Sequence, residues 1–300
     1  MEAAGVGERP QRRSAGRRLA DLFHGRRGAQ VAAFLAAPLT WLVVVYLGSL
    51  AILFVTAFWH LDDFTGEIER GFSFENFQTL IEQDVYRSIA GRTIGVAALV
   101  TVTDALLAFP IAFYMAKVAS PRVQGLLVVA VLMPLWSSYL VKVYAWRTIL
   151  SEEGALNWAL GPIGLSTPDG DIFRLWLVMS YLWLPFMVIP IYAGLERIPD
   201  SLLSASQDLG AGPGTTFRRV ILPLAFPAVV AGSIFTFSLT LGDFIAPQLV
   251  SSTQFIGNVV YTNVGIANNL PLAAAFAAVP VIVMILYLLM ARRLGAFEQL

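Results

Sequence analysis

The amino-acid sequence predicts an all-α polytopic membrane protein with six transmembrane helices. Of its 300 residues, 57% are hydrophobic and only 13% are charged, and the mean hydropathy is +0.70. A soluble domain of this length carries about 25% charged residues. The apolar residues also gather in six runs, each close to the ~20 residues that a helix needs to cross a bilayer.

The predicted spans alternate with polar loops along the chain. A basic tail, residues 1–30, comes first. It either contains an interfacial helix over residues 17–23 or has no regular structure. Residues 31–87 hold the first span and an extracytoplasmic loop, and residues 88–293 hold a five-helix core with a cytoplasmic loop at 197–223. We place the spans at residues 31–58, 89–116, 125–147, 173–196, 224–249 and 271–291.

The basic residues indicate the orientation of the chain. If the N-terminus is cytoplasmic, 14 of the 20 Lys and Arg residues fall on the cytoplasmic side. Because cytoplasmic segments are enriched in Lys and Arg, we expect both termini in the cytoplasm. The acidic outer loop at 59–88 is then either a solvated loop or a docking surface, and 250–270 is a short re-entrant or interfacial helix.

Small residues and prolines inside the spans indicate close packing and bending. Gly91 and Gly95 stand four residues apart, a spacing that lets helices approach closely in lipid. Proline removes a backbone N–H group and bends a helix. Prolines interrupt the apolar runs at positions 110, 134, 185, 190 and 227, so we expect a bundle that moves or lines a path.

The chain lacks the motifs of an enzyme. It has no cysteine, and its two histidines, His24 and His60, show no metal-ligand spacing. It also lacks the G-x-x-x-x-G-K-[ST] phosphate loop, so we expect no ATP, metal or other cofactor on this chain. The formal net charge of zero implies no nucleic-acid partner.

Ionisable residues within the predicted spans are candidates for a translocation path, because a charge in hydrocarbon is costly unless it faces water or a partner. Acidic and aromatic groups together suit an organic cation, through charge and cation–π contacts. The alternatives are a structural ion pair of Asp243 with Lys142 or Arg147, and an interfacial aromatic belt. The path candidates are Asp104, Trp136, Tyr139, Lys142, Tyr144, Trp146 and Asp243.

The polar loop at 200–223 has the pattern of a short helix followed by a sharp turn. Asp200 or Ser201 is suited to cap the free N–H groups of a helix that begins there. The glycines and the proline of residues 210–214 end that helix. The chain then re-enters the apolar run through Arg218 and Arg219.

This loop resembles the E-A-A-x-x-x-G-x₉-I-x-L-P signature of type I ABC-importer permeases. Residues 204–206, Gly210 and residues 220–223 match its spacing, although serines replace the leading Glu and the second Ala. Further segments resemble the spermidine/putrescine branch of that family. Members of that branch often have Arg at the position that Lys142 occupies in this sequence. These segments are residues 137–146, 154–157, 208–211, 217–227 and 241–247.

The resemblance implies a non-catalytic, multi-pass permease subunit of an ATP-driven uptake system in the bacterial inner membrane, for polyamines or a similar small organic cation. It implies four partners: a cytoplasmic ABC ATPase dimer that holds ATP and Mg, a second related permease, an extracytoplasmic solute-binding protein and the lipid bilayer. The alternatives are an ABC permease for another solute, an ion-coupled secondary transporter using Asp104 and Asp243, and a scaffold or channel subunit. The residues implied to couple to the ATPase are Ser204, Ala205, Ser206, Asp208, Gly210, Arg218, Arg219, Leu222 and Pro223.

Overall fold

The computed structural model describes residues 27–62, 64–168 and 170–293. Residues 1–26 of the basic tail, with the alternative helix at 17–23, lie outside the described residues, and residues 27–30 form the start of a helix. Contacts divide the chain into two units, residues 1–55 and 56–300. Among the described residues, five helical runs are long and apolar enough to cross a membrane, and a bent helix pair makes a sixth.

The described part of the first unit is one helical run. It consists of α2 (Arg27–Trp41), the π-helix η1 (Leu42–Leu47) and α3 (Gly48–Thr56), which ends one residue into the second unit. Its side chains are largely exposed, as expected for a helix whose surroundings are lipid. The run confirms the helix predicted over 31–58.

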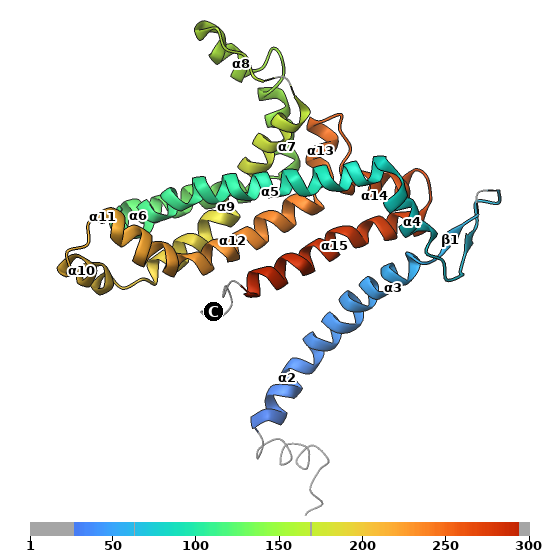
Figure 1. Ribbon diagram of the computed structural model, residues 1–300, viewed down its shortest axis with the longest axis horizontal. Helices are drawn as coiled ribbons and strands as arrows, with labels where there is room; N and C mark the ends of the chain where they lie inside the picture. Colours follow the sequence, from blue (N-terminus) through green and yellow to red (C-terminus); the bar gives the residue numbers. More distant parts are fainter. Residues whose placement is uncertain (1–26, 63, 169, 294–300) are drawn as a thin grey trace, which may run out of the picture. The chain divides into compact units, whose positions relative to one another are not determined.

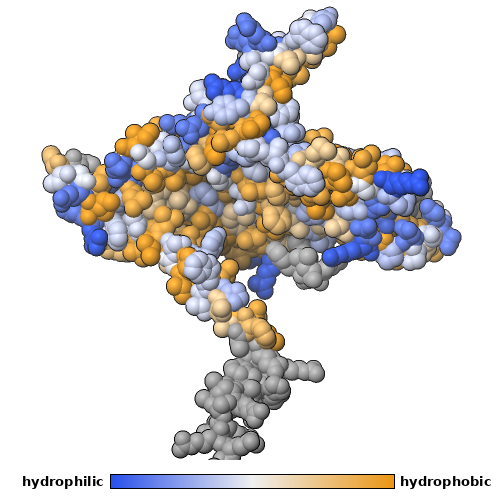
Figure 2. All heavy atoms as spheres, turned by 180° about the vertical axis from the view of Figure 1, so that it is seen from behind, coloured by the Kyte–Doolittle hydropathy of each residue, from blue (hydrophilic) through white to orange (hydrophobic). Residues whose placement is uncertain are grey.

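Four long helical runs form the body of the second unit and lie side by side in Figure 1. Among them, α5, α9 and α12 pack most closely with one another. Figure 2 shows apolar side chains along these helices and hydrophilic ones gathered at the ends. The runs are α5 (Asp84–Phe113) with the π-helix η2 (Tyr114–Val118), α9 (Asp171–Glu196), α12 (Leu222–Gly242) and α15 (Leu270–Arg293).

The helix predicted over 224–249 is shifted along the chain. Helix α12 continues directly from α11 (Pro213–Thr216) and the π-helix η4 (Phe217–Ile221). The apolar helical run therefore spans Pro213–Gly242. It ends at Gly242 because the backbone turns extended at Asp243 (ψ 130°). A separate short helix, α13 (Ile245–Val250), follows.

The span predicted over 125–147 is a bent pair of helices and not one continuous helix. Two helices, α6 (Pro121–Trp136) and α7 (Tyr139–Ile149), meet there at an angle of 93°. Ser137 and Ser138 adopt extended backbone angles between them. The carbonyl oxygen of Pro134 accepts hydrogen bonds from the Ser137 hydroxyl (2.8 Å) and the Lys142 ammonium (3.0 Å). Side chains therefore satisfy a carbonyl that the break leaves without a helical partner.

The loop after the first unit contains a small hairpin that the sequence analysis did not predict. Strand β1 (His60–Leu61) pairs antiparallel with β2 (Ile68–Glu69). At its turn, the backbone N–H groups of Thr65 and Phe64 donate to Asp62 and hold the pKa of that carboxyl below its usual value. The turn is thus organised by one acidic side chain.

The short helix α4 (Glu75–Glu82) follows the hairpin. Its buried Asn76 amide donates to the carbonyl oxygens of Ala57 (3.0 Å) and Trp59 (2.8 Å), which joins the helix to the preceding chain. The remaining short elements are α8 (Ala155–Leu160), the 3₁₀ helix η3 (Gly161–Ile163) and α14 (Ile256–Gly265). The last of these confirms a short helix within 250–270.

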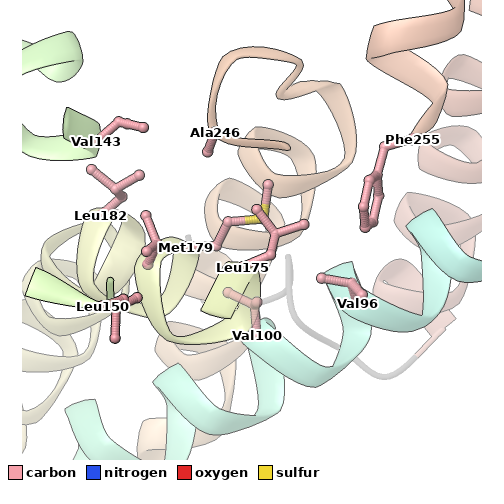
Figure 3. Packing of buried hydrophobic residues seen from close by; sticks show 10 residues of the cluster. Val96, Val100, Val143, Leu150, Leu175, Met179, Leu182, Ala246 and Phe255 are labelled. Carbon is pink, nitrogen blue, oxygen red and sulfur yellow. The ribbon is translucent and has the colours of Figure 1, made fainter. Parts of the chain in front are cut away.

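A buried apolar cluster holds the two short helices α7 and α13 against the long ones (Figure 3). Val143 of α7 and Ala246 of α13 are both fully buried in it. Helix α7 directly follows the helix interruption at residues 137–138, and α13 directly follows the one at residues 243–244. The cluster therefore fixes the position of both helix interruptions. Its other members are Val96 and Val100 of α5, Leu175, Val178, Met179 and Leu182 of α9, Leu150 and Phe255.

Candidate functional site

The predicted turn after residue 208 is a helix C-terminal motif built on Gly210. Helix α10 (Asp200–Asp208) ends with the N–H of Gly210 bonded to the Gln207 carbonyl (2.8 Å) and that of Ala211 bonded to the Ser206 carbonyl (3.0 Å). This pair of bonds requires a left-handed residue between the helix and the following chain. Gly210 supplies it, with φ +78°.

The loop built around α10 presents most of its side chains to the surroundings and lies at one end of the second unit (Figure 1). The half-buried Ser206 is different, because its hydroxyl bonds to that of Thr216 (2.9 Å) and ties α10 to α11. Leu209 lies between the predicted coupling residues Asp208 and Gly210, and it is an apolar residue that is 89% exposed. Sequence reasoning missed it. The predicted coupling residues that are exposed are Ser204, Ala205, Asp208, Gly210, Arg218, Arg219, Leu222 and Pro223.

The prediction that Asp200 or Ser201 caps α10 is wrong. The N-cap residue is Pro199, and no side chain caps the helix. Asp200 instead accepts a hydrogen bond from the Lys117 ammonium at 3.0 Å. Ser204, at the position of the family's glutamate, donates to the Asp200 carbonyl (3.2 Å) within the helix.

Asp243 lies at the break between α12 and α13. Its carboxylate accepts a hydrogen bond from the Tyr139 hydroxyl, and bonds from the N–H groups of Ile245 (2.9 Å) and Ala246 (3.3 Å). The alternative ion pair is wrong, because neither Lys142 nor Arg147 forms a salt bridge with Asp243 in the part of the chain that the structure describes. The Lys142 ammonium donates to a carbonyl of its own bent segment. The carboxylate therefore connects the two helix interruptions, the one before α7 and the one before α13.

The tyrosine that binds Asp243 stacks on one ring of an aromatic pair. The ring of Tyr139 stacks on Trp183 of α9, with centroids 5.9 Å apart and planes at 22°. Trp183 also contacts Phe186 (6.0 Å), and its buried indole N–H has no hydrogen-bond partner among the described residues. Sequence reasoning missed Trp183, since one tryptophan in an apolar run has no distinguishing pattern.

The other path candidates of the bent helix pair lie apart from this group. Trp136 is 78% exposed and Tyr144 is exposed as well, which fits the belt alternative. Trp146 packs on the ring of Tyr181 (5.2 Å). Arg147 contributes to a separate polar cavity of about 370 Å³ that is also lined by Arg174.

Asp104 lies in the interior of the helix bundle. It is completely buried (0% exposed) within α5, one of the three most closely packed helices. The Ser180 side chain of α9 lies beside it. Neither carboxyl oxygen, nor the Ser180 hydroxyl, makes a hydrogen bond within the described residues. Asp104 thus lies at a helix–helix interface.

Comparisons with known proteins agree with this architecture. Residues 89–297 match the family described as "binding-protein-dependent transport system inner membrane component". The chain is 43% identical over 314 residues to the inner membrane ABC transporter permease protein YdcU of Escherichia coli (strain K12), covering 99% of this chain and 100% of that protein. It is 32% identical over 256 residues to the spermidine/putrescine transport system permease protein PotB of the same organism, covering 83% and 92%.

A solved structure shares the fold. It is a bacterial alginate ABC transporter in complex with an alginate pentasaccharide-bound periplasmic protein, with a TM-score of 0.73. The match covers 90% of this chain and 94% of that one. At 19% identity it establishes the helical arrangement alone.

Proposed function

Because this chain belongs to the family of binding-protein-dependent transport system inner membrane components, and is a multi-pass permease subunit of an ABC importer, we propose that its solute is a polyamine or a similar small organic cation. Spermidine and putrescine are the solutes named for a relative that matches 83% of the chain. The side chains that meet at the two helix interruptions support the same class of solute.

The observation that carries this proposal is the group formed by Asp243, Tyr139 and Trp183. A carboxylate beside stacked aromatic rings suits an alkylammonium ion, which gains both charge attraction and cation–π contact. The group lies where helices are interrupted, and interrupted helices place backbone carbonyls where a cation can bind them. An ammonium ion displacing the Tyr139 hydroxyl from Asp243 is the contact that we propose for the solute.

We also propose that the α10 loop couples the chain to a separate cytoplasmic ATPase dimer, which binds ATP and Mg. The exposed side chains of the loop and its rigid turn at Gly210 suit a docking element. This assignment places the loop and both termini in the cytoplasm, as the distribution of Lys and Arg predicts. A second related permease completes the pore, and the extracytoplasmic binding protein delivers the solute.

The solute is tested in proteoliposomes that contain this chain with its co-purified permease and ATPase, supplied with the binding protein. We expect saturable, ATP-dependent uptake of spermidine or putrescine. Asp243→Asn and Tyr139→Phe are expected to change the uptake KM, whereas Tyr114→Phe, on the exposed Tyr114 of η2, is the matched control. Uptake restricted to sugars or anions would disprove the solute class, and uptake driven by an ion gradient without ATPase would disprove ATP coupling.

A further inference from the structure

We propose that Lys117 is a positioning residue that holds α10 to the transmembrane helices, so that α10 and the end of α5 move together; this inference rests on the proposed coupling role of α10. The Lys117 side chain, at the last turn of η2, is only 10% exposed. Its ammonium donates to the carbonyl oxygen of Ile198 (2.6 Å) and to Oδ1 of Asp200 (3.0 Å). One side chain thus contacts both the turn before α10 and its first residue.

The position of the ammonium follows from how α9 ends. The last carbonyl groups of a helix have no partners within the helix and carry partial negative charge. Helix α9 ends at Glu196, and Pro199, which has no N–H group, precedes α10. A cation beside Ile198 therefore satisfies an acceptor that this short turn leaves free.

A second side chain joins the two adjacent helices, α6 and α9. Gln124 of α6 donates to the Tyr192 hydroxyl (2.6 Å) and to Oε1 of Glu196 (3.3 Å), both on α9. The Lys117 contact with Asp200 and the Gln124 contact with Tyr192 join residues 83 and 68 positions apart in the sequence. Together they connect the turn between η2 and α6 to the end of α9.

Apolar packing supports these polar contacts. The buried Met115 of η2 and Ile198 belong to one cluster, and Leu203 of α10 and Phe217 of η4 pack against it. Because Leu203 lies in α10, this cluster also connects α10 to the long helices. A rigid connection of this kind is what a docked helix needs in order to pass its displacement to the bundle.

The burial of the two charged groups predicts how their substitutions rank. The side chain of Asp200 is 86% exposed, and exposed ion pairs contribute little. The ammonium of Lys117 is nearly buried, so its loss leaves the Ile198 carbonyl without its donor. We therefore expect Lys117→Met to have a larger effect than Asp200→Asn, and Lys117→Arg to restore part of the function.

The first test measures the ATP hydrolysed per solute molecule imported by the complete transporter. Lys117→Met is expected to raise this ratio roughly fivefold or more, at the lower end of typical coupling between sites. Arg122→Met, on the exposed Arg122 of α6, is the matched control and keeps the wild-type ratio. A Lys117→Met transporter with the wild-type ratio would overturn the inference. If that variant fails to fold, Lys117→Gln, which removes the charge and shortens the side chain, is measured instead, and an unchanged ratio there overturns the inference as well.

The second test needs neither solute nor ATPase. The chain has no cysteine, so Gln207→Cys on the exposed face of α10 provides one site for a spin label. In the full chain in lipid nanodiscs, we expect Lys117→Met to increase the mobility of this label and Lys117→Arg to increase it less. Equal mobility in wild type and Lys117→Met overturns the inference. Absence of ATP-dependent uptake by the wild-type complex refutes the proposed function and leaves this result intact.

Discussion

Replacing Gly210 by alanine is expected to weaken ATPase binding by destabilising the end of α10. Gly210 has φ +78°, and a methyl group added there would meet no heavy atom within 4 Å. The cost is therefore conformational and not steric. For a residue with a Cβ in the left-handed region it is roughly 1–2 kcal/mol.

This cost sets the size of the expected effect. A change of 1–2 kcal/mol alters the population of a conformation by a factor of about 5–30. If the ATPase binds only the ordered turn, its Kd rises by up to the same factor in Gly210→Ala. Asparagine tolerates left-handed angles better than alanine, so Gly210→Asn should weaken binding less.

Gly212 offers the matched control, two residues along the same loop. Its φ is −71°, and an added methyl group would again meet no heavy atom within 4 Å. Titration of the purified chain with its ATPase, followed by calorimetry, measures Kd for each variant. Equal Kd values for Gly210→Ala and Gly212→Ala would refute this reasoning, as would weaker binding by Gly210→Asn than by Gly210→Ala.

Three further predictions concern stability, measured as thermal or denaturant unfolding of the detergent-solubilised chain by tryptophan fluorescence. Asp104→Leu should raise the unfolding free energy by about 1–3 kcal/mol, because it removes a buried polar group without a partner; a decrease would mean that the carboxyl is satisfied in the folded protein. Gly194→Ala should lower it by about 1–3 kcal/mol through overpacking, since the added methyl would overlap Ala228 where α9 and α12 touch; an unchanged value would show that these helices separate easily. Asn76→Ala should lower it by about 1–3 kcal/mol, because two carbonyls lose their donor, and wild-type stability would show that water replaces the amide.

The sequence predicted the long helices well because hydropathy alone determines which segments enter a bilayer. It did not predict which proline would interrupt a span. Prolines 110, 185, 190 and 227 lie inside continuous helices, whereas helix α6 ends just after Pro134. The difference depends on Ser137 and Lys142, whose side chains satisfy the Pro134 carbonyl. That compensation is a tertiary contact that spacing along the chain does not reveal.

The partners of the charged residues show the same limit. Charge alone favours Lys142 or Arg147 as the partner of Asp243, yet the donor is Tyr139, 104 residues away in the sequence. Asp200 likewise suits a helix cap by position, and it binds Lys117 instead. The residue types were sufficient to identify acidic and aromatic candidates, but the packing of α7 and α13 decides which of them meet.

The π-helix η4 has a consequence for the length of the chain between Gly210 and Leu222. A π turn holds one residue more than an α turn, and one residue corresponds to about 100° of rotation in an α-helix. Within η4, Phe217 sets its ring edge-on against Phe109 of α5, with centroids 5.6 Å apart. Deleting one residue there would convert the π turn to an α turn and keep nearly the same rotation of the loop around the helix axis, whereas deleting one in the α-helical turns beside it would rotate the loop by about 100°. The chain therefore tolerates the loss of one residue at η4 far better than in the α-helical turns on either side of it.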